Sequence, residues 1–214
     1  SLAESQLTAG DIAAGVDAYI KAGDASKYDG VITAANEAGA FADLVRFLQM
    51  ARKKLRETAI ETELCYAYAR TEQLSDLEDF INGPHGAQIL NVGERCFGEG
   101  LYAAAKILFN NISNYARLAT TLVRLGEYQA AVDAASKANN IQTWKEVNAA
   151  CVEQEKFRLA RICGLHIIVN AEELDSLIRF YEARGHFDEI IALIEGGLGD
   201  ERAHTGMFTE LAIL

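Results

Sequence analysis

The sequence contains little that would interrupt a helix. Among its 214 residues Pro84 is the only proline, whereas alanine occurs 35 times. Proline is the strongest helix breaker and alanine the best helix former. Half of the residues are apolar, which is sufficient for a continuous core. We therefore expect an all-α protein.

Long apolar runs and positive charge are also scarce. No run approaches the roughly 20 apolar residues that a membrane-spanning helix needs, and residues 1–10 lack the charged and apolar regions of a signal peptide. Twenty lysines and arginines face 31 acidic residues, which gives a net charge of −11. A protein of this charge repels a phosphate backbone. The sequence thus predicts a soluble, cytoplasmic protein that does not insert into membranes and does not have nucleic acid as its main partner.

The motifs that usually indicate catalysis are missing. The sequence has no GxxxxGK[ST] loop, no HExxH, no GxSxG and no GxGxxG after a strand. The four histidines, at positions 85, 166, 186 and 204, lie far apart and none belongs to a metal-binding arrangement. We interpret His166, which lies among apolar residues, as a core or turn histidine. No enzyme activity, cofactor or metal site is expected.

The four cysteines do not form a CxxC pair. Each lies in an apolar helical run, where a free cysteine behaves as a small hydrophobic residue. Disulfides are rare in cytosolic proteins. We therefore interpret these four residues as reduced, buried, structural thiols: Cys65, Cys96, Cys151 and Cys163.

The dominant pattern is an internal repeat. Six times a helix-like run opens on a large apolar residue, here called an anchor, at intervals of 33, 28, 26, 29 and 30 residues. A period of this length, with helical patterning inside each unit, is typical of stacked repeat arrays. The six anchors are Phe41, Leu74, Tyr102, Tyr128, Phe157 and Phe187.

Each repeat unit has the pattern of a helical hairpin. Apolar residues follow an anchor at i+3, i+4 and i+7, as in Phe41–Leu48, and the segment before an anchor repeats that spacing. A glycine stands two residues before four of the anchors, where a left-handed residue can end one helix before the next begins. Glu72 and Glu155 replace this glycine in the other two units. There we expect another turn geometry or a shifted boundary.

The stretches around these hairpins carry a more specific signal. They are Leu48–Lys54, Glu61–Leu64, Phe80–Pro84, Leu125–Asp133, Thr143–Val147, Cys163–Ile167, Glu201–His204 and Gly206–Leu214. In this order, and over nearly the whole chain, they are similar to the clathrin heavy chains in the part of the leg that consists of clathrin heavy-chain repeats. The resemblance is to the knee and the beginning of the proximal leg.

This resemblance implies a fold and a role. The fold is a right-handed α-α superhelix, a solenoid of stacked helical hairpins. Residues 1–214 would form one such segment, of about seven repeats, cut from a longer chain. The role is structural: legs of this family interweave into the polygonal coat around vesicles, on the cytoplasmic face of coated pits, in transport and endocytosis. The implied partners are other heavy chains and possibly the light chain, whose main site would lie beyond this segment.

Two other functions remain open on the sequence. One is a vacuolar-sorting tethering subunit that uses the same repeat. The other is a tetratricopeptide-like adaptor that binds peptide tails, suggested by Leu125–Tyr128 and Ala131. The mean period of about 29 residues is shorter than the 34 of tetratricopeptide repeats, which disfavours the adaptor.

Two features are candidate partner-binding sites. Arg52, Lys53, Lys54 and Arg56 form the only dense basic cluster, which could meet an acidic face of a neighbouring leg, a light chain or an anionic membrane. The simpler interpretation is a solvated helix face with nearby acidic residues. Trp144, the sole tryptophan, could be a binding hot spot. The other interpretation, which we favour, is a packing residue between repeats.

Overall fold

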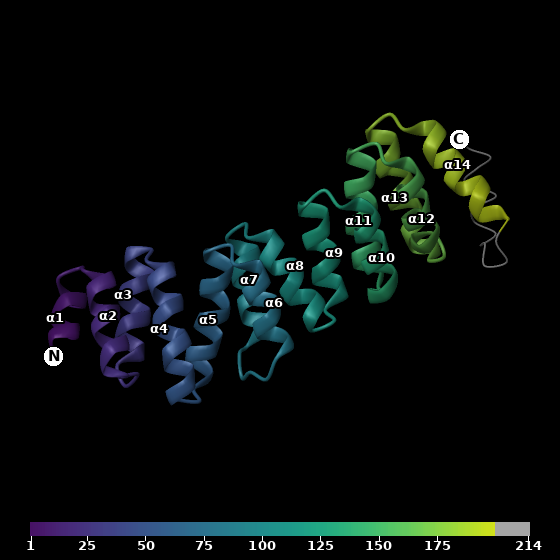
Figure 1. Ribbon diagram of the computed structural model, residues 1–214. Coiled ribbons are helices and arrows are strands. Elements are labelled where there is room, and N and C mark those ends of the chain that lie inside the picture. Colours follow the sequence, from purple (N-terminus) through teal and green to yellow (C-terminus); the bar gives the residue numbers. More distant parts are fainter. Residues whose placement is uncertain (200–214) are drawn as a thin grey trace. The chain divides into compact units, whose positions relative to one another are not determined.

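The computed structural model describes residues 1–199, and in this range the chain is helical with no strand (Figure 1). The expected all-α fold is confirmed. The helices of the first half are α1 (Leu2–Thr8), α2 (Ile12–Ala22), α3 (Tyr28–Ala38), α4 (Phe41–Lys54), α5 (Thr58–Arg70), α6 (Leu74–Asn82), α7 (Ile89–Gly98) and α8 (Tyr102–Asn111). Those of the second half are α9 (Tyr115–Arg124), α10 (Tyr128–Ala138), α11 (Ile141–Glu153), α12 (Phe157–Ile167), α13 (Ala171–Ala183) and α14 (Phe187–Leu198).

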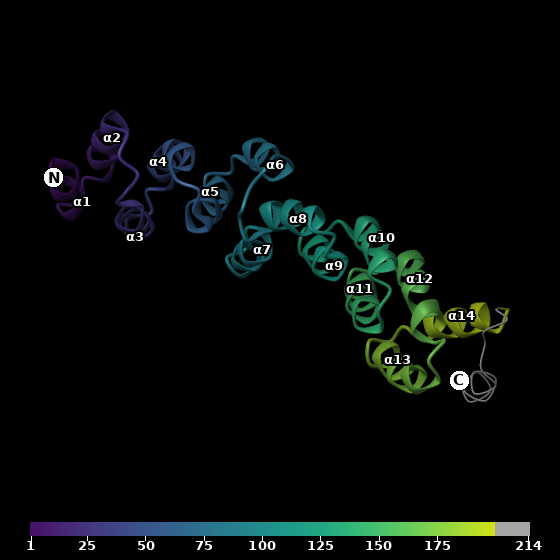
Figure 2. The ribbon, with the colours of Figure 1, turned by 90° about the horizontal axis from the view of Figure 1, so that it is seen from below.

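The helices belong to two compact units, one of residues 1–113 and one that starts at Asn114. In each unit most consecutive helices pack against each other and helices two apart share a layer, as Figure 2 shows. In the first unit α2 contacts α4, α5 contacts α7 and α6 contacts α8. In the second, α9 contacts α11, α10 contacts α12 and α12 contacts α14. This is the packing of an α-solenoid. The handedness, the repeat number and the single-segment organisation stay predictions.

All six anchors are the first residue of a helix, in α4, α6, α8, α10, α12 and α14. Behind them the predicted stripes are buried, as at Leu44, Val45 and Leu48. The anchors themselves are less uniform. Phe41 is buried, the next four are partly exposed, and Phe187 is 50% exposed. The first residue of a helix lies at the edge of its layer, where solvent reaches the side chain more easily than in the middle of the stripe.

The turns before the anchors share one geometry, and this corrects the expectation for Glu72 and Glu155. Both glutamates have positive φ, at 56° and 54°, like the four glycines in the equivalent turns. In all six turns the N–H of the next residue donates to the carbonyl five residues earlier, over 2.7–3.0 Å. That bond closes a Schellman motif. The hydrogen bonds thus hold a glutamate in a conformation that normally favours glycine.

Glycines inside helices let neighbouring helices approach closely. A Cβ atom added to Gly164 in α12 would lie 2.6 Å from Leu193 Cδ2 in α14, and one added to Gly93 in α7 would lie 2.9 Å from Phe109 Cε1 in α8. Side-chain carbons do not approach so closely without a shift of the structure. The close packing of α7 with α8 inside one hairpin, and of α12 with α14 between two hairpins, therefore depends on these two glycines.

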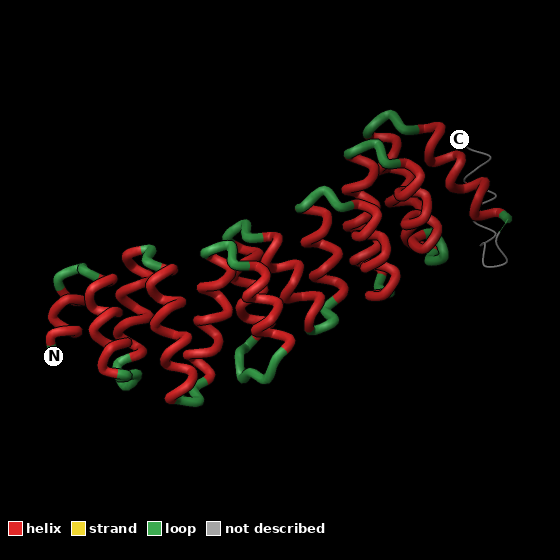
Figure 3. The backbone as a smooth tube through the Cα atoms, in the orientation of Figure 1, coloured by secondary structure: helices red, strands yellow, loops and turns green. Residues whose placement is uncertain are grey.

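The strongest predicted break, around Pro84, is a loop between α6 and α7 (Figure 3). The stretches from Glu201 to the last residue, and His204 with them, lie outside the described residues.

Candidate functional site

A ladder of polar contacts joins helices of the same layer across neighbouring hairpins. Its members lie 26 to 33 residues apart, close to the repeat period. The hydrogen-bonded and ion pairs are Asp17–Arg46, Glu63–Arg95, Tyr66–Glu99, Thr120–Glu146, Gln129–Arg158, Lys145–Glu173, Asn148–Tyr181, Glu153–Arg184 and Arg161–Glu189. We call this set the repeat ladder. We did not predict these pairs from the sequence. Oppositely charged residues spaced by about one repeat period could have indicated them.

The ladder is most elaborate around Tyr66 of α5. The Tyr66 hydroxyl donates to Glu99 Oε2 at 2.5 Å, and the Arg95 guanidinium lies 3.4 Å from the centre of the Tyr66 ring. Arg95 also donates to Glu63 at 3.4 Å and to Asn36 of α3 at 3.0 Å. Burial and the bond to Glu99 raise the pKa of Tyr66 to about 12. These contacts hold α3, α5 and α7 together, which is a structural role.

The basic cluster divides into one structural residue and three exposed ones. Arg52 donates to Glu61 Oε1 and to the Pro84 carbonyl, both at 3.3 Å, and lies 4.6 Å from the centre of the Phe80 ring. It therefore ties the end of α4 to α5, α6 and the loop after α6. The sequence did not distinguish Arg52 from its neighbours.

Lys53, Lys54 and Arg56 are exposed, and none makes an ion pair with another residue in the range 1–199. The two lysines occupy the last turn of α4, where positive charge is favoured by the helix dipole. Arg56 borders a groove of about 470 Å³ between the start of α5 and the loop at Pro84. Three cations on an acidic chain are thus free to meet a partner.

Trp144 does not face solvent. It is 3% exposed, and its ring stacks on His166 with 4.1 Å between ring centres and 5° between planes. The structure therefore places Trp144 as a packing residue between α11 and α12. His166 is exposed in the last turn of α12 rather than in the core, and it covers the tryptophan.

The four cysteines are buried free thiols, as predicted. Burial raises the pKa of Cys65 and Cys96 to about 12. A hydrogen bond with Cys151 in α11, together with burial, raises the pKa of Cys163 in α12. This pairing was not predicted. In the described part of the chain no group of three or more potential ligands could hold a metal ion. Likewise, no helix described there is long and apolar enough to cross a membrane.

Comparison with known proteins places these features in a family. The sequence model for the region found in clathrin and VPS proteins matches residues 19–159. The chain belongs to the clathrin repeat family. The resemblance seen in the sequence is thereby confirmed.

Clathrin heavy chains match the whole chain. It is 60% identical over 213 residues to the clathrin heavy chain of Drosophila melanogaster, 56% identical to that of Dictyostelium discoideum and 55% identical to clathrin heavy chain 2 of Homo sapiens. Each alignment covers 100% of this chain and 13% of the relative. The chain thus matches a segment of clathrin heavy chains.

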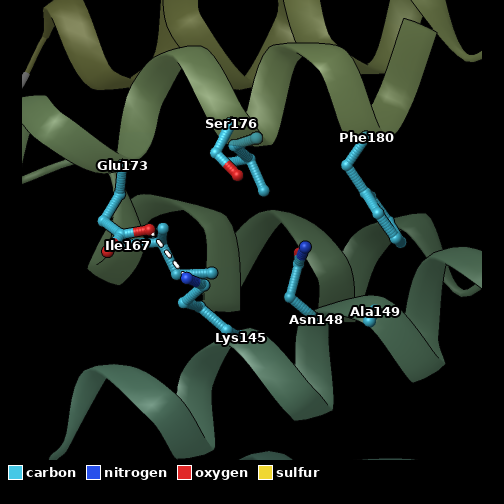
Figure 4. A pocket seen from close by; sticks show the side chains of 8 residues that line it. Lys145, Asn148, Ala149, Ile167, Glu173, Ser176 and Phe180 are labelled. Carbon is cyan, nitrogen blue, oxygen red and sulfur yellow. Dashed lines mark ion pairs between the residues drawn. The ribbon is translucent and has the colours of Figure 1, made fainter. Parts of the chain in front are cut away.

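The second unit also contains a slot between two neighbouring hairpins. It has a volume of about 170 Å³ and opens between α11 and α13, with Ile167 of α12 contributing to its wall (Figure 4). The residues from α11 are Lys145, Asn148 and Ala149, and those from α13 are Glu173, Ser176, Leu177 and Phe180. Neither the repeat period nor any motif indicated this slot.

Proposed function

We propose that this chain is a structural segment of a clathrin heavy-chain leg. In that role it forms part of the edges of the polygonal coat in vesicle-mediated transport and endocytosis, on the cytoplasmic face of coated pits and vesicles. The observation that carries the proposal is the similarity to clathrin heavy chains over the full chain, at 55–60% identity for relatives from fly, slime mould and human. Stacked hairpins without a catalytic constellation are consistent with a structural role.

The repeat ladder supports a mechanical role. An exposed ion pair contributes only about 0–1 kcal/mol to stability, so the apolar stripes must supply most of the folding energy. The ladder contacts are directional, however, and each joins a fixed pair of positions on neighbouring hairpins. Within each unit they oppose sliding of one hairpin along the next. A leg segment needs this resistance, because a coat edge transmits force along the chain.

We further propose that Lys53, Lys54 and Arg56 contact an acidic face of a neighbouring heavy chain. The three cations are exposed and unpaired within the described range, and the chain as a whole carries a charge of −11. Complementary charges of this kind guide association and set its register more than they add affinity. The light chain is a second partner that this cluster fits, although its main site would lie beyond this segment.

The alternatives are less well supported. The matching family model covers VPS proteins as well as clathrin. Nevertheless, the high identity to clathrin heavy chains favours the coat over a vacuolar-sorting tethering subunit. No observation favours a tetratricopeptide-like adaptor.

The experiment replaces the matching segment of a full-length clathrin heavy chain by this chain and measures coat assembly by sedimentation and electron microscopy. The chimaera should assemble. The variant Lys53→Glu/Lys54→Glu should assemble less well, with a loss that shrinks as salt is added, because salt screens exposed charges. Lys21→Glu/Lys156→Glu changes the net charge equally at two other exposed lysines and should assemble normally.

A folded chimaera that fails to assemble would refute the leg function. Equal losses in the two charge variants would refute only the proposed role of the basic cluster, because net charge would then account for the effect.

A further inference from the structure

An exposed hydroxyl group follows the basic cluster directly. Thr58, the first residue of α5, comes two, four and five positions after the three exposed cations Arg56, Lys54 and Lys53. Its side chain is exposed and borders the groove of about 470 Å³ next to the loop at Pro84. Within the described part of the chain, no hydrogen bond engages the Thr58 hydroxyl. This hydroxyl is therefore available to a modifying enzyme.

The backbone before Thr58 is extended. Helix α4 ends at Lys54 and α5 begins at Thr58. Between them Leu55 has φ −128° and ψ 135°, and Glu57 has φ −109° and ψ 131°. These are the angles of a β-strand, in which successive side chains point in opposite directions and can enter the binding groove of a partner. An enzyme can thus contact Arg56 and Thr58 together without first unfolding a helix.

The structure distinguishes Thr58 from another hydroxyl that has a similar sequence context. Thr120 follows Arg117 by three positions, so a nearby cation by itself would favour it too. However, Thr120 lies inside α9, and its Oγ1 is 3.2 Å from the Ala116 carbonyl oxygen and 3.0 Å from Glu146 Oε2. An enzyme would have to open the helix to reach this hydroxyl. Thr58 combines preceding cations, an extended backbone and a free hydroxyl.

The surroundings of Thr58 have room for a phosphate. Its Oγ1 lies 3.9 Å from the position that a Cβ atom of Gly86 would occupy, and the absent side chain leaves this part of the groove open. Two carboxylates also border the groove. Glu61 is already paired with Arg52 and with the Gly86 N–H, and Glu57 is exposed, so salt and solvent screen its repulsion of a phosphate.

We propose that Thr58 is the phosphorylation site of a serine/threonine kinase that selects basic residues before its acceptor. The Thr58 Oγ1 attacks the γ-phosphorus of ATP, ADP leaves with the bridging oxygen, and the hydroxyl proton passes to the catalytic aspartate of the kinase. The phosphate carries a charge of about −1.5 to −2 at pH 7, which offsets about two of the three positive charges of Lys53, Lys54 and Arg56. Phosphorylation therefore weakens the contact proposed above for these cations. This consequence rests on the proposed function, whereas the site itself does not.

The first test incubates the folded 214-residue chain with ATP and the catalytic subunits of two basophilic kinases, cyclic-AMP-dependent protein kinase and protein kinase C. Mass spectrometry should find phosphate on Thr58 and none on Thr120. Lys53→Gln/Arg56→Gln should lower the initial rate at least about tenfold, because the kinase loses the charges that guide and orient the segment. Lys21→Gln/Lys156→Gln removes the same charge at two other exposed positions and should leave the rate unchanged.

Three results of this test would overturn the proposal. The first is absence of phosphate on Thr58 with both kinases. The second is an equal rate in the two charge variants, because the basic cluster would then not direct the kinase. The third is equal modification of Thr120, which would mean that the extended backbone and the free hydroxyl do not determine the site.

The second test concerns the consequence of phosphorylation. Thr58→Glu, which places a negative charge at the site, should lower coat assembly of the chimaera described above, and added salt should reduce the loss. Ser136→Glu, at an exposed position of α10, should leave assembly unchanged. If Lys53→Glu/Lys54→Glu lowers assembly and Thr58→Glu does not, the regulatory consequence is refuted. If neither lowers assembly, the proposed contact of the basic cluster fails as well, and phosphorylation of Thr58 is still decided by the first test.

Discussion

Replacing Glu155 by glycine should stabilise the second unit. Glu155 ends the turn between α11 and α12 with φ at 54°, a conformation that costs a residue with a Cβ roughly 1–2 kcal/mol. Glycine removes this strain, although it loses more conformational entropy on folding, which costs about 0.5–1 kcal/mol. The Glu155 side chain is exposed and makes no hydrogen bond or ion pair in the described structure, so little else is lost. The net gain should be about 0.5–1 kcal/mol.

The assay is urea denaturation followed by the fluorescence of Trp144, which lies in the same hairpin. The sole tryptophan stacks on His166 across α11 and α12, so its emission reports on the helices that the Glu155 turn connects. With an m value of about 2 kcal/mol/M, a gain of this size moves the midpoint upward by about 0.3–0.5 M. The m value itself should not change, because the same surface is exposed on unfolding.

Two further substitutions isolate the cause. Gly126→Ala introduces a Cβ at φ 74° in the equivalent turn of the preceding hairpin and should destabilise by about 1 kcal/mol. Gln154→Gly changes the neighbouring residue, whose φ is −98°, and should also destabilise, by about 0.5–1 kcal/mol. If Glu155→Gly destabilised as much as Gln154→Gly does, left-handed strain at Glu155 would not be the controlling effect.

Two further predictions concern packing and pH. Gly164→Ala should lower the free energy of unfolding by about 1–3 kcal/mol through overpacking against Leu193, and Leu193→Ala should cost less in that background than in the original chain, as a double-mutant cycle would measure. Tyr66→Phe should cost about 1–2 kcal/mol, because the hydrogen bond to Glu99 is lost. Because the pKa of Tyr66 is raised to about 12 from a reference of 10.0, its contribution to stability is complete below pH 10 and is lost between pH 10 and 12. Urea midpoints at pH 9, 10 and 11 should therefore fall more steeply for the original chain than for Tyr66→Phe, and parallel slopes would contradict this assignment.

Local features of the sequence predicted much of the fold. Helices were indicated by composition and by apolar spacing, both of which act within a few turns of chain. The six anchors each begin a helix because the residues before them end the preceding helix, and this is also a local property. Burial of the cysteines followed from the apolar runs around them. The family resemblance was carried by contiguous stretches, so it too could be recognised without a structure.

The sequence by itself therefore determined the helical hairpins and the family, whereas tertiary structure decided which side chains meet. Glu72 and Glu155 adopt positive φ because a hydrogen bond across each turn outweighs their intrinsic preference. Pairs such as Tyr66–Glu99 and Asn148–Tyr181 join residues 33 positions apart, and they form only when neighbouring hairpins stack in one register. Packing of α11 against α12 within one hairpin buried Trp144 beneath His166, and the stacking of the next hairpin left the slot between α11 and α13. The physical reason is that helix formation depends on near neighbours, while the register between hairpins is set by packing along the whole interface.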